Sequence, residues 1–243
     1  ASTSPNLQII ASLDVARRQM ELEGYELVTH AIALAIEIRR DVNSHPLVSK
    51  YFRVLSPAEM IPPEFRPSGL VNYTDPGVTW AQALEAFLHD EFVLDPTRLT
   101  LVCGTAGYDG TQFKGILAAD YGIQLNKTSR NSVLLQTNIN NTRSDVANLL
   151  RVLVEISRKI EESLQEGGEP ARAAFMRRVK SLMEDVPGLP NFSRFHDRFR
   201  TDPSGTTLEG DMRSAFYMAY REECCEHLGL FDPEVDRRIA AGP

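Results

Sequence analysis

The chain has 243 residues, enough for one large domain or two small ones with a packed core. Hydrophobic residues make up 42% and charged residues 24%, and 26 basic against 33 acidic side chains give a net charge of −7. This acidic balance argues against nucleic acid as the main partner. The sequence has neither an apolar run near the roughly 18 residues that cross a bilayer nor a basic, apolar leader. We therefore expect a cytoplasmic protein that binds neither nucleic acid nor membrane.

The cysteines are Cys103, Cys224 and Cys225, an odd number that argues against a disulfide framework and for reduced thiols. Cys224, Cys225 and His227 form a group of potential ligands. They lack the two-residue gap that is typical of zinc sites. We therefore expect no metal site.

The chain opens with two apolar series at helical spacing: Ile9, Leu13, Ala16 and Met20, then Leu27, Ala31, Leu34 and Ile38. Ser4 is a suitable N-cap, with Pro5 at the first helical position. Gly24 interrupts the pattern between the two series. The sequence therefore predicts two helices, of which the second ends in a loop at residues 43–46.

The next segment predicts a short strand, a long connection, a helix and a second strand. The first strand covers Tyr51–Leu55, and prolines break up the connection that follows over residues 57–76, so we expect no regular structure there. A helix is expected from about Thr79 to Leu88. Leu99–Val102 has the composition of a buried strand, which ends at Gly104.

A glycine-rich turn over residues 104–111 leads from that strand into a helix that closes at Tyr121 and Gly122. The backbone N–H groups of such a turn can bind phosphate. However, the run matches neither the dinucleotide fingerprint nor the P-loop. A tight turn with Asp109 or Thr111 as helix cap is the preferred interpretation.

Alternating residues at Ile123–Asn126 and Val133–Gln136 predict a hairpin that turns over residues 128–131. Arg130 lies at its tip, where a planar guanidinium could bind a carboxylate through two hydrogen bonds. Turn arginines are also commonly just solvated charges. The role of Arg130 is therefore left open.

The rest of the chain predicts helices. A capping-box pattern at residues 142–145 precedes a long amphipathic helix that stops at Gly167 and Gly168. Further helices are expected over Pro170–Asp185, from about Leu208 to Leu228, and from Pro233. Strand, helix, hairpin and helix in the middle of the chain indicate an α+β fold, with a small antiparallel or mixed sheet and helices on one face.

Few residues suggest chemistry by themselves. Ser2, Thr3 and Ser4 place hydroxyls beside the unpaired N–H groups of a helix start, an arrangement that can bind phosphate, although plain capping is the preferred interpretation from the residues alone. Residues 192–200 combine aromatic and basic side chains, as single-stranded nucleic-acid sites do. The helical spacing of their phenylalanines favours a half-buried helical turn instead. Neither a nucleophile elbow nor a pair of positioned carboxylates is found.

Two long blocks, Leu94–Thr111 and Tyr121–Ser132, resemble the C-terminal half of the bacterial ornithine/lysine/arginine decarboxylases, which depend on pyridoxal 5'-phosphate (PLP) and have fold type I. The shorter runs Ser2–Pro5, Glu209–Arg213 and Asp232–Arg238 resemble the same family. The resemblance therefore extends over nearly the whole chain in separated blocks.

The resemblance implies a fold similar to that of aspartate aminotransferase, with a large cofactor domain, a small α+β domain and a helical C-terminal domain. We accordingly expect residues 1–45 to be a helical segment that leads from the cofactor domain. Residues 46–168 would form the small domain, and residues 169–243 a truncated helical C-terminal domain.

The resemblance also implies that Ser2, Thr3 and Ser4 lie near the phosphate of PLP, in a homodimer or higher homo-oligomer where that cofactor belongs to the neighbouring subunit. PLP chemistry needs a lysine for the Schiff base and a carboxylate beside the pyridine nitrogen. The family's Ser-x-His-Lys and Asp-x-Ala-His motifs are both missing from this chain. We therefore expect no catalytic residue here, but a fragment that begins after the lysine and is cut before the family's C-terminal end. The remainder of the same polypeptide would bind most of the PLP.

The resemblance implies a lyase of polyamine biosynthesis, which converts ornithine, lysine or arginine into its amine and CO2. The sequence does not choose among these three substrates. Two alternatives stay open: another fold-type-I PLP enzyme such as an aminotransferase, and a non-catalytic interaction or regulatory module.

Overall fold

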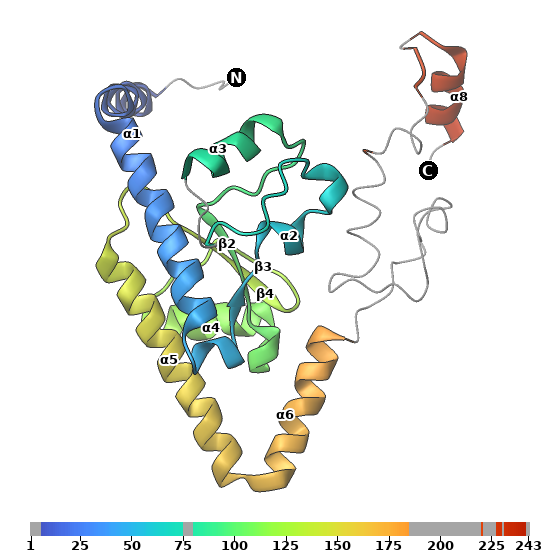
Figure 1. Ribbon diagram of the computed structural model, residues 1–243. Helices are drawn as coiled ribbons and strands as arrows, with labels where there is room; N and C mark the ends of the chain where they lie inside the picture. Colours follow the sequence, from blue (N-terminus) through green and yellow to red (C-terminus); the bar gives the residue numbers. More distant parts are fainter. Residues whose placement is uncertain (1–5, 75–79, 185–219, 221–226, 230, 242–243) are drawn as a thin grey trace. The chain divides into compact units, whose positions relative to one another are not determined.

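The computed structural model describes residues 6–74, 80–184, 220, 227–229 and 231–241. The chain divides into two compact units, residues 1–179 and 180–243. The first unit contains the sheet and the helices around it (Figure 1). In the second unit, the described structure is the end of helix α6 and the short helix α8 (Pro233–Ala241).

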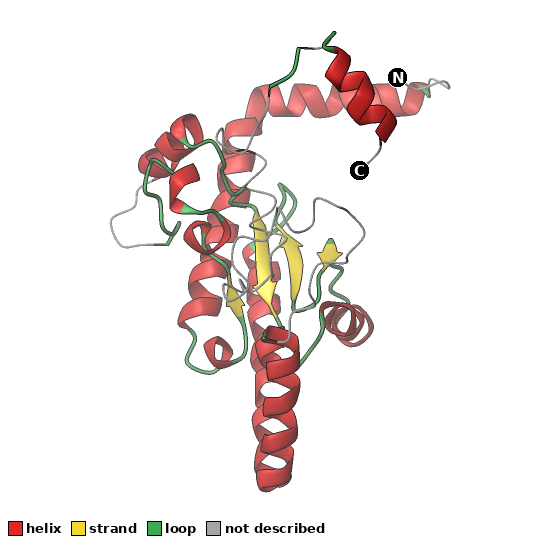
Figure 2. Cartoon of the chain, turned by 90° about the vertical axis from the view of Figure 1, so that its right-hand side faces the viewer, coloured by secondary structure: helices red, strands yellow, loops and turns green. Residues whose placement is uncertain are grey.

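The sheet has four antiparallel strands in the order β1-β2-β4-β3 (Figure 2). Their bounds are β1 Arg53–Val54, β2 Arg98–Val102, β3 Lys127–Thr128 and β4 Ser132–Gln136. In the central pair, Leu99 lies opposite Leu135 and Leu101 opposite Val133. Because side chains alternate along a strand, these four residues point to the same face, and all four are buried.

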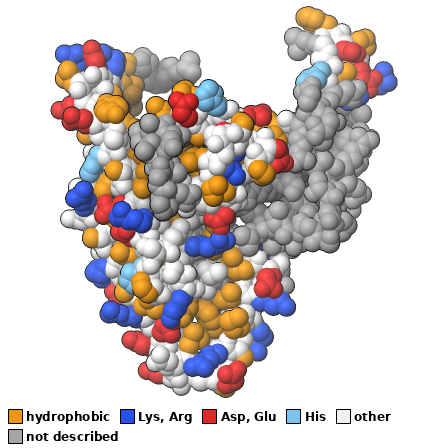
Figure 3. Space-filling model, viewed as in Figure 1, with side chains coloured by type: hydrophobic (Ala, Val, Ile, Leu, Met, Phe, Trp, Pro, Cys, Tyr) orange, Lys and Arg blue, Asp and Glu red, His pale blue; other side chains and the backbone are white. Residues whose placement is uncertain are grey.

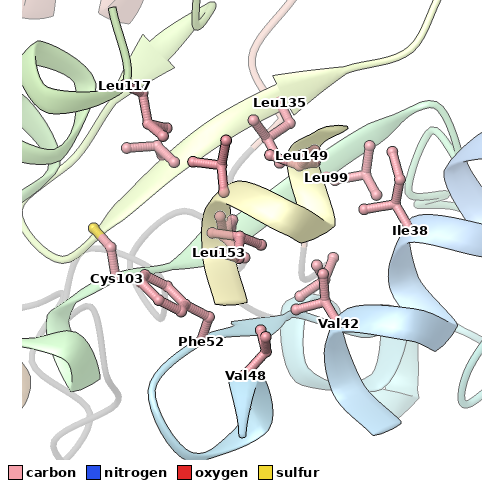
Figure 4. Close-up of a cluster of buried hydrophobic side chains, with 14 of the residues drawn as sticks. Ile38, Val42, Val48, Phe52, Leu99, Cys103, Leu117, Leu135, Leu149 and Leu153 are labelled. Carbon is pink, nitrogen blue, oxygen red and sulfur yellow. The ribbon is translucent and has the colours of Figure 1, made fainter. Parts of the chain in front are cut away.

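Three helices complete the hydrophobic core of the first unit: α1 (Leu7–Ser44), α4 (Gly110–Tyr121) and α5 (Arg143–Glu166). Figure 4 shows how their side chains meet those of the strands: Ile38 and Val42 from α1, Leu117 from α4, Leu149 and Leu153 from α5, and Leu99 and Leu135 from the sheet. The α+β fold class expected from the sequence is confirmed, with a sheet that is antiparallel throughout.

The prediction of two opening helices is wrong, because α1 is one helix of 38 residues that continues through Gly24. The helix bends along its course, so that its first turns are seen end-on in Figure 1 and lengthwise in Figure 2. A glycine inside a helix costs only about 1 kcal/mol relative to alanine. Gly24 is buried beneath Met20, whose Cε lies 3.0 Å from where a Cβ of residue 24 would be.

The N-cap of α1 is also different from the one expected. The side chain of Asn6 accepts hydrogen bonds from the backbone N–H groups of Gln8 and Ile9, at 2.9 and 3.3 Å. Asn6 therefore caps the helix, in place of Ser4, which lies outside the described residues.

The proline-rich connection is more regular than its composition suggests. It contains the short helices α2 (Pro57–Met60) and η2 (Pro63–Phe65), after which α3 (Trp80–His89) follows as expected. A full capping box starts α2, since Ser56 and Glu59 each bind the other's backbone N–H. The expectation of no regular structure over residues 57–76 is therefore wrong at these two places.

A buried arginine connects α1 to the sheet. Arg39 donates one hydrogen bond to the carbonyl oxygen of Leu55 at 2.8 Å and one to that of Arg98 at 2.6 Å. Its guanidinium carbon lies 5.5 Å from the ring centre of Tyr73, whose hydroxyl donates to the carbonyl oxygen of Leu94. Burial lowers the pKa of Arg39 and raises that of Tyr73 to about 12. These bonds hold the end of β1 and the start of β2 at fixed positions beside α1.

The later elements follow the sequence pattern more closely. Thr142 and Asp145 form the expected capping box of α5, and Gly122 ends α4 in the left-handed conformation, with φ +66°. The first hairpin strand is shifted from residues 123–126 to β3 at 127–128.

Two further helices complete the described first unit. The short helix η1 (Val48–Lys50) follows α1. Helix α6 (Gly168–Met183) follows α5, and its first residue, Gly168, has a φ of +58°. The domain boundaries after residues 45 and 168 stay predictions.

Candidate functional site

The glycine-rich turn after β2 binds the tip of the β3–β4 hairpin. The chain leaves β2 through the short helix η3 (Gly104–Ala106) and turns at Gly107, where φ is +78°. The side chain of Asp109 then accepts a hydrogen bond from the N–H of Gln112 at 2.8 Å and caps α4. The interpretation of this run as a tight turn capped by Asp109 is confirmed.

The hairpin binds three backbone N–H groups at this turn. Those of Cys103 and Gly104 both donate to the carbonyl oxygen of Asn131 at 2.9 Å, and that of Gly110 donates to the carbonyl oxygen of Arg130 at 3.2 Å. A Cβ on residue 110 would lie 2.1 Å from the carbonyl oxygen of Ser129, so only glycine allows this approach. The glycines of the turn thus seat the hairpin, and these N–H groups have no free capacity for a phosphate.

Arg130 lies at the hairpin tip as the sequence indicated. Its backbone carbonyl is bound to Gly110, which holds the main chain in place, while its side chain is exposed. A fixed backbone with an exposed guanidinium is compatible with binding a carboxylate. A substrate role for Arg130 stays a prediction.

A cavity of about 280 Å³ lies beside this turn, between α4, α5 and α6. Its polar lining residues are Tyr108, Gln112, Lys159, Ser163 and Arg178. Arg178 donates through Nε to the carbonyl oxygen of Gly107 and through Nη2 to the Gln112 side-chain oxygen at 2.6 Å. Burial raises the pKa of Tyr108, and the cations of Lys159 and Arg178 act against this shift. Two cations, an amide and hydroxyls around one cavity are groups that can hold an anion.

Sequence reasoning missed Arg178. It lies in a helix with other arginines, and no local pattern distinguishes it from Arg172 or Arg177. Its partner Gly107 is 71 positions earlier in the chain. Only the packing of α6 beside the turn, where the Phe175 ring meets that of Tyr51 edge-on at 6.2 Å, shows its role.

Comparison with known protein families gives one finding that decides the identity. The family model described as Orn/Lys/Arg decarboxylase, major domain, matches residues 1–154, which is more than half of the 243 residues. The chain belongs to the Orn/Lys/Arg decarboxylase family. A search of the curated proteins found no match for it.

The lysines of this Orn/Lys/Arg decarboxylase family member do not fit covalent attachment of PLP. All five are exposed or partly exposed: Lys50, Lys114, Lys127, Lys159 and Lys180. A Schiff-base lysine must lose its proton, for which enzymes lower its pKa by burial or by nearby cations. Among the described residues, none of the five lysines is buried in this way, and the N–H groups of Gly104 and Gly110 are already bound by the hairpin.

Lys159 shows the opposite of what a Schiff-base lysine needs. Its ammonium donates to a carboxylate oxygen of Glu155 at 2.9 Å and to the hydroxyl of Tyr121 at 3.1 Å. The hydrogen bond with Glu155, followed by that with Tyr121, raises the pKa of Lys159, and the same bond with Lys159 lowers that of Glu155. Lys159 is therefore held in its charged form and connects α5 to the end of α4.

The other residues proposed from sequence lie wholly or partly outside the described structure. These are Ser2, Thr3 and Ser4, the run at 192–200, and Cys224 and Cys225. Within the described ranges, no three His, Cys, Asp or Glu side chains gather in a way that could hold a metal ion. None of the helices in the same ranges is long and apolar enough to cross a membrane.

Proposed function

We propose that the chain is part of a cytoplasmic PLP-dependent decarboxylase, which converts ornithine, lysine or arginine into its amine and CO2 in polyamine biosynthesis. The match of the family model over residues 1–154 carries this proposal. The blocks at Leu94–Thr111 and Tyr121–Ser132 lie within the matched range and form the turn, α4 and the hairpin.

In this proposal the 243 residues alone do not catalyse the reaction. None of the lysines is buried, so the Schiff-base lysine must come from residues other than these. PLP would supply the electron sink for the loss of CO2, and parts of the enzyme absent from this chain would hold most of it. The contribution of Ser2, Thr3 and Ser4 would be to donate hydrogen bonds to its phosphate in a homodimer or higher homo-oligomer.

A trapping experiment tests the proposed inactivity of the chain. The purified chain is incubated with PLP and borohydride, and the labelled peptides are identified by mass spectrometry. We expect weak labelling spread over the five lysines, without CO2 release from ornithine, lysine or arginine. A Lys159→Met variant is the control. The ion pair with Glu155 should make Lys159 less reactive than the other lysines, so its removal should leave the total labelling nearly unchanged. A stoichiometric adduct at one lysine would contradict the proposal.

The reaction itself is tested on an enzyme that also contains the family's Ser-x-His-Lys segment. We expect CO2 and the corresponding diamine or agmatine-type amine from one of the three basic amino acids. Transfer of the amino group to a keto acid, without CO2 release, would instead identify an aminotransferase.

A further inference from the structure

The cavity between α4, α5 and α6 differs in charge from the chain as a whole. The chain has more acidic than basic side chains, 33 against 26. The lining of the cavity, as far as the structure describes it, includes Lys159 and Arg178 and neither Asp nor Glu. Glu162 and Glu166 line a separate hollow beside it. The charge of the lining therefore favours an anion over a cation.

Arg178 provides a guanidinium whose charge no carboxylate neutralises within the described ranges. Two of its five N–H groups are used, by the carbonyl oxygen of Gly107 and the side-chain oxygen of Gln112. Helix α6 packs so closely on the turn that a Cβ on residue 107 would lie 3.1 Å from the ring of Phe175. The guanidinium is thus fixed in position and keeps N–H groups for a ligand.

Uncharged donors complete the lining. The hydroxyls of Tyr108 and Ser163 have no hydrogen-bond partner among the described residues. The Gln112 side chain keeps its N–H groups, because Arg178 uses its oxygen. Donors therefore come from the turn, α4, α5 and α6, and they surround the cavity from several directions.

This arrangement suits phosphate better than carboxylate. Phosphate presents acceptor oxygens in tetrahedral directions, whereas a carboxylate has two oxygens in one plane. The remaining lining is apolar and includes Ile160, Leu164 and Phe175. On the face shown in Figure 3, apolar side chains gather between α5 and α6, with charged ones at the edges. An apolar wall beside the donors can contact a small organic substituent on the phosphate.

The size of the cavity limits that substituent. Its volume of about 280 Å³ is just below the roughly 300 Å³ at which pockets for drug-sized ligands begin. A single water takes up roughly 30 Å³. The cavity therefore has room for a phosphate group with a few carbon atoms, but not for a nucleotide.

We propose that this cavity binds the phosphate group of free phosphate or of a small phosphomonoester, with Arg178 as its main cation and Gln112, Tyr108 and Ser163 as further donors. Lys159, whose side chain is 62% exposed and bonded to Glu155, adds charge at the open side. Bound phosphate would fasten α6 to the turn that seats the β3–β4 hairpin. The site is independent of the proposed decarboxylase function.

Isothermal titration calorimetry of the purified chain with inorganic phosphate, at constant ionic strength and without PLP, tests the site. We expect one phosphate per chain with a Kd of about 1 mM or below, as for a few charge-assisted hydrogen bonds. Arg178→Gln should weaken binding at least about tenfold. Arg177→Gln removes the same charge from α6 outside the cavity lining and should change the Kd less than about twofold. Either the absence of saturable binding or an equal loss in both variants would overturn the proposal.

A Gln112→Glu variant separates phosphate binding from the structural role of Arg178. The carboxylate has nearly the shape of the amide and can accept the same hydrogen bond from Nη2, so α6 should stay in place. Its negative charge should nevertheless weaken phosphate binding at least about tenfold. Circular dichroism and thermal unfolding check that the variant is folded. Unchanged binding in Gln112→Glu would place the phosphate elsewhere and contradict the proposed site.

Two further ligands define the chemical class. Glycerol 3-phosphate that binds as tightly as inorganic phosphate would identify a phosphomonoester site, and binding of inorganic phosphate alone would identify a site for the free ion. Acetate should bind at least about tenfold more weakly than phosphate, and equally tight acetate would overturn the choice of phosphate. Because PLP is absent from all these titrations, their results do not bear on the decarboxylase activity.

Discussion

The two parts of α1 have similar apolar content and very different surroundings. In the second part, Leu34 is 1% exposed and Val42 1%, because α5 and the sheet pack against them. In the first part, Leu7 is 80% exposed and Leu13 64%. Apolar periodicity predicts a helix in both parts, but it does not tell which partner covers the apolar stripe. The difference shows that burial, and with it stability, depends on what the rest of the fold brings to the helix.

The largest expected difference is between two leucine truncations in α1. Leu34→Ala should lower the free energy of unfolding by about 3 kcal/mol, since it removes buried methyl groups and leaves a cavity. Leu13→Ala should change it by less than about 0.5 kcal/mol. Urea titrations of the two variants provide the measurement. Similar losses for the two variants would show that Leu13 is also packed in solution.

Two glycines of α4 give a smaller difference in stability, because one is closely packed and the other lies in open space. Gly110→Ala should destabilise by about 2 kcal/mol or more, since the new Cβ would meet the carbonyl oxygens of Ser129 and Ser132 at 2.1 and 2.5 Å. Gly115→Ala has open space and should stabilise by about 0.5 to 1 kcal/mol. Thermal unfolding of the two variants should shift in opposite directions. A neutral Gly110→Ala would mean that the hairpin is not seated on the turn.

The smallest expected effect is a pH dependence of stability that comes from Tyr73, which contacts Arg39 in the packed part of α1. Burial raises the pKa of Tyr73 to about 12, so the folded protein keeps this proton at a pH where the unfolded chain has lost it. Stability should therefore fall as the pH rises from 10 to 12. Tyr73→Phe should reduce the loss between pH 9 and 11 by about 1 kcal/mol, as measured by urea titration at both values. An equal loss of stability in both proteins would show that Tyr73 is exposed to solvent.

Local signals in the sequence predicted several element ends correctly. Asp109 and the capping box of Thr142 and Asp145 mark helix starts, because their side chains accept hydrogen bonds from backbone N–H groups of the first turn. Gly122 marks a helix end, because glycine adopts the left-handed conformation that ends the helix. Two of the wrong predictions have clear physical reasons. Gly24 did not break α1, and prolines did not prevent α2, since Pro57 occupies the first helical position, where no N–H is needed.

The candidate site was less accessible to sequence reasoning. The glycine-rich turn and the hairpin with Arg130 were each recognised, but not that the N–H of Gly110 binds the carbonyl oxygen of Arg130. The bonds of Arg178 to Gly107 and Gln112 were not foreseen at all. These contacts join residues far apart in the chain, and the residue types alone do not specify which distant groups meet.

The sequence by itself determined the α+β class, the family resemblance and the absence of the Ser-x-His-Lys motif, because these depend on residue order and local pattern. Only the tertiary structure decided what the glycines of the turn do and how the five lysines are placed. The N–H groups of Cys103, Gly104 and Gly110 are taken up by Asn131 and Arg130, and every lysine keeps access to water. Both results depend on which distant segments pack together, and packing also distinguishes the buried second part of α1 from its exposed first part.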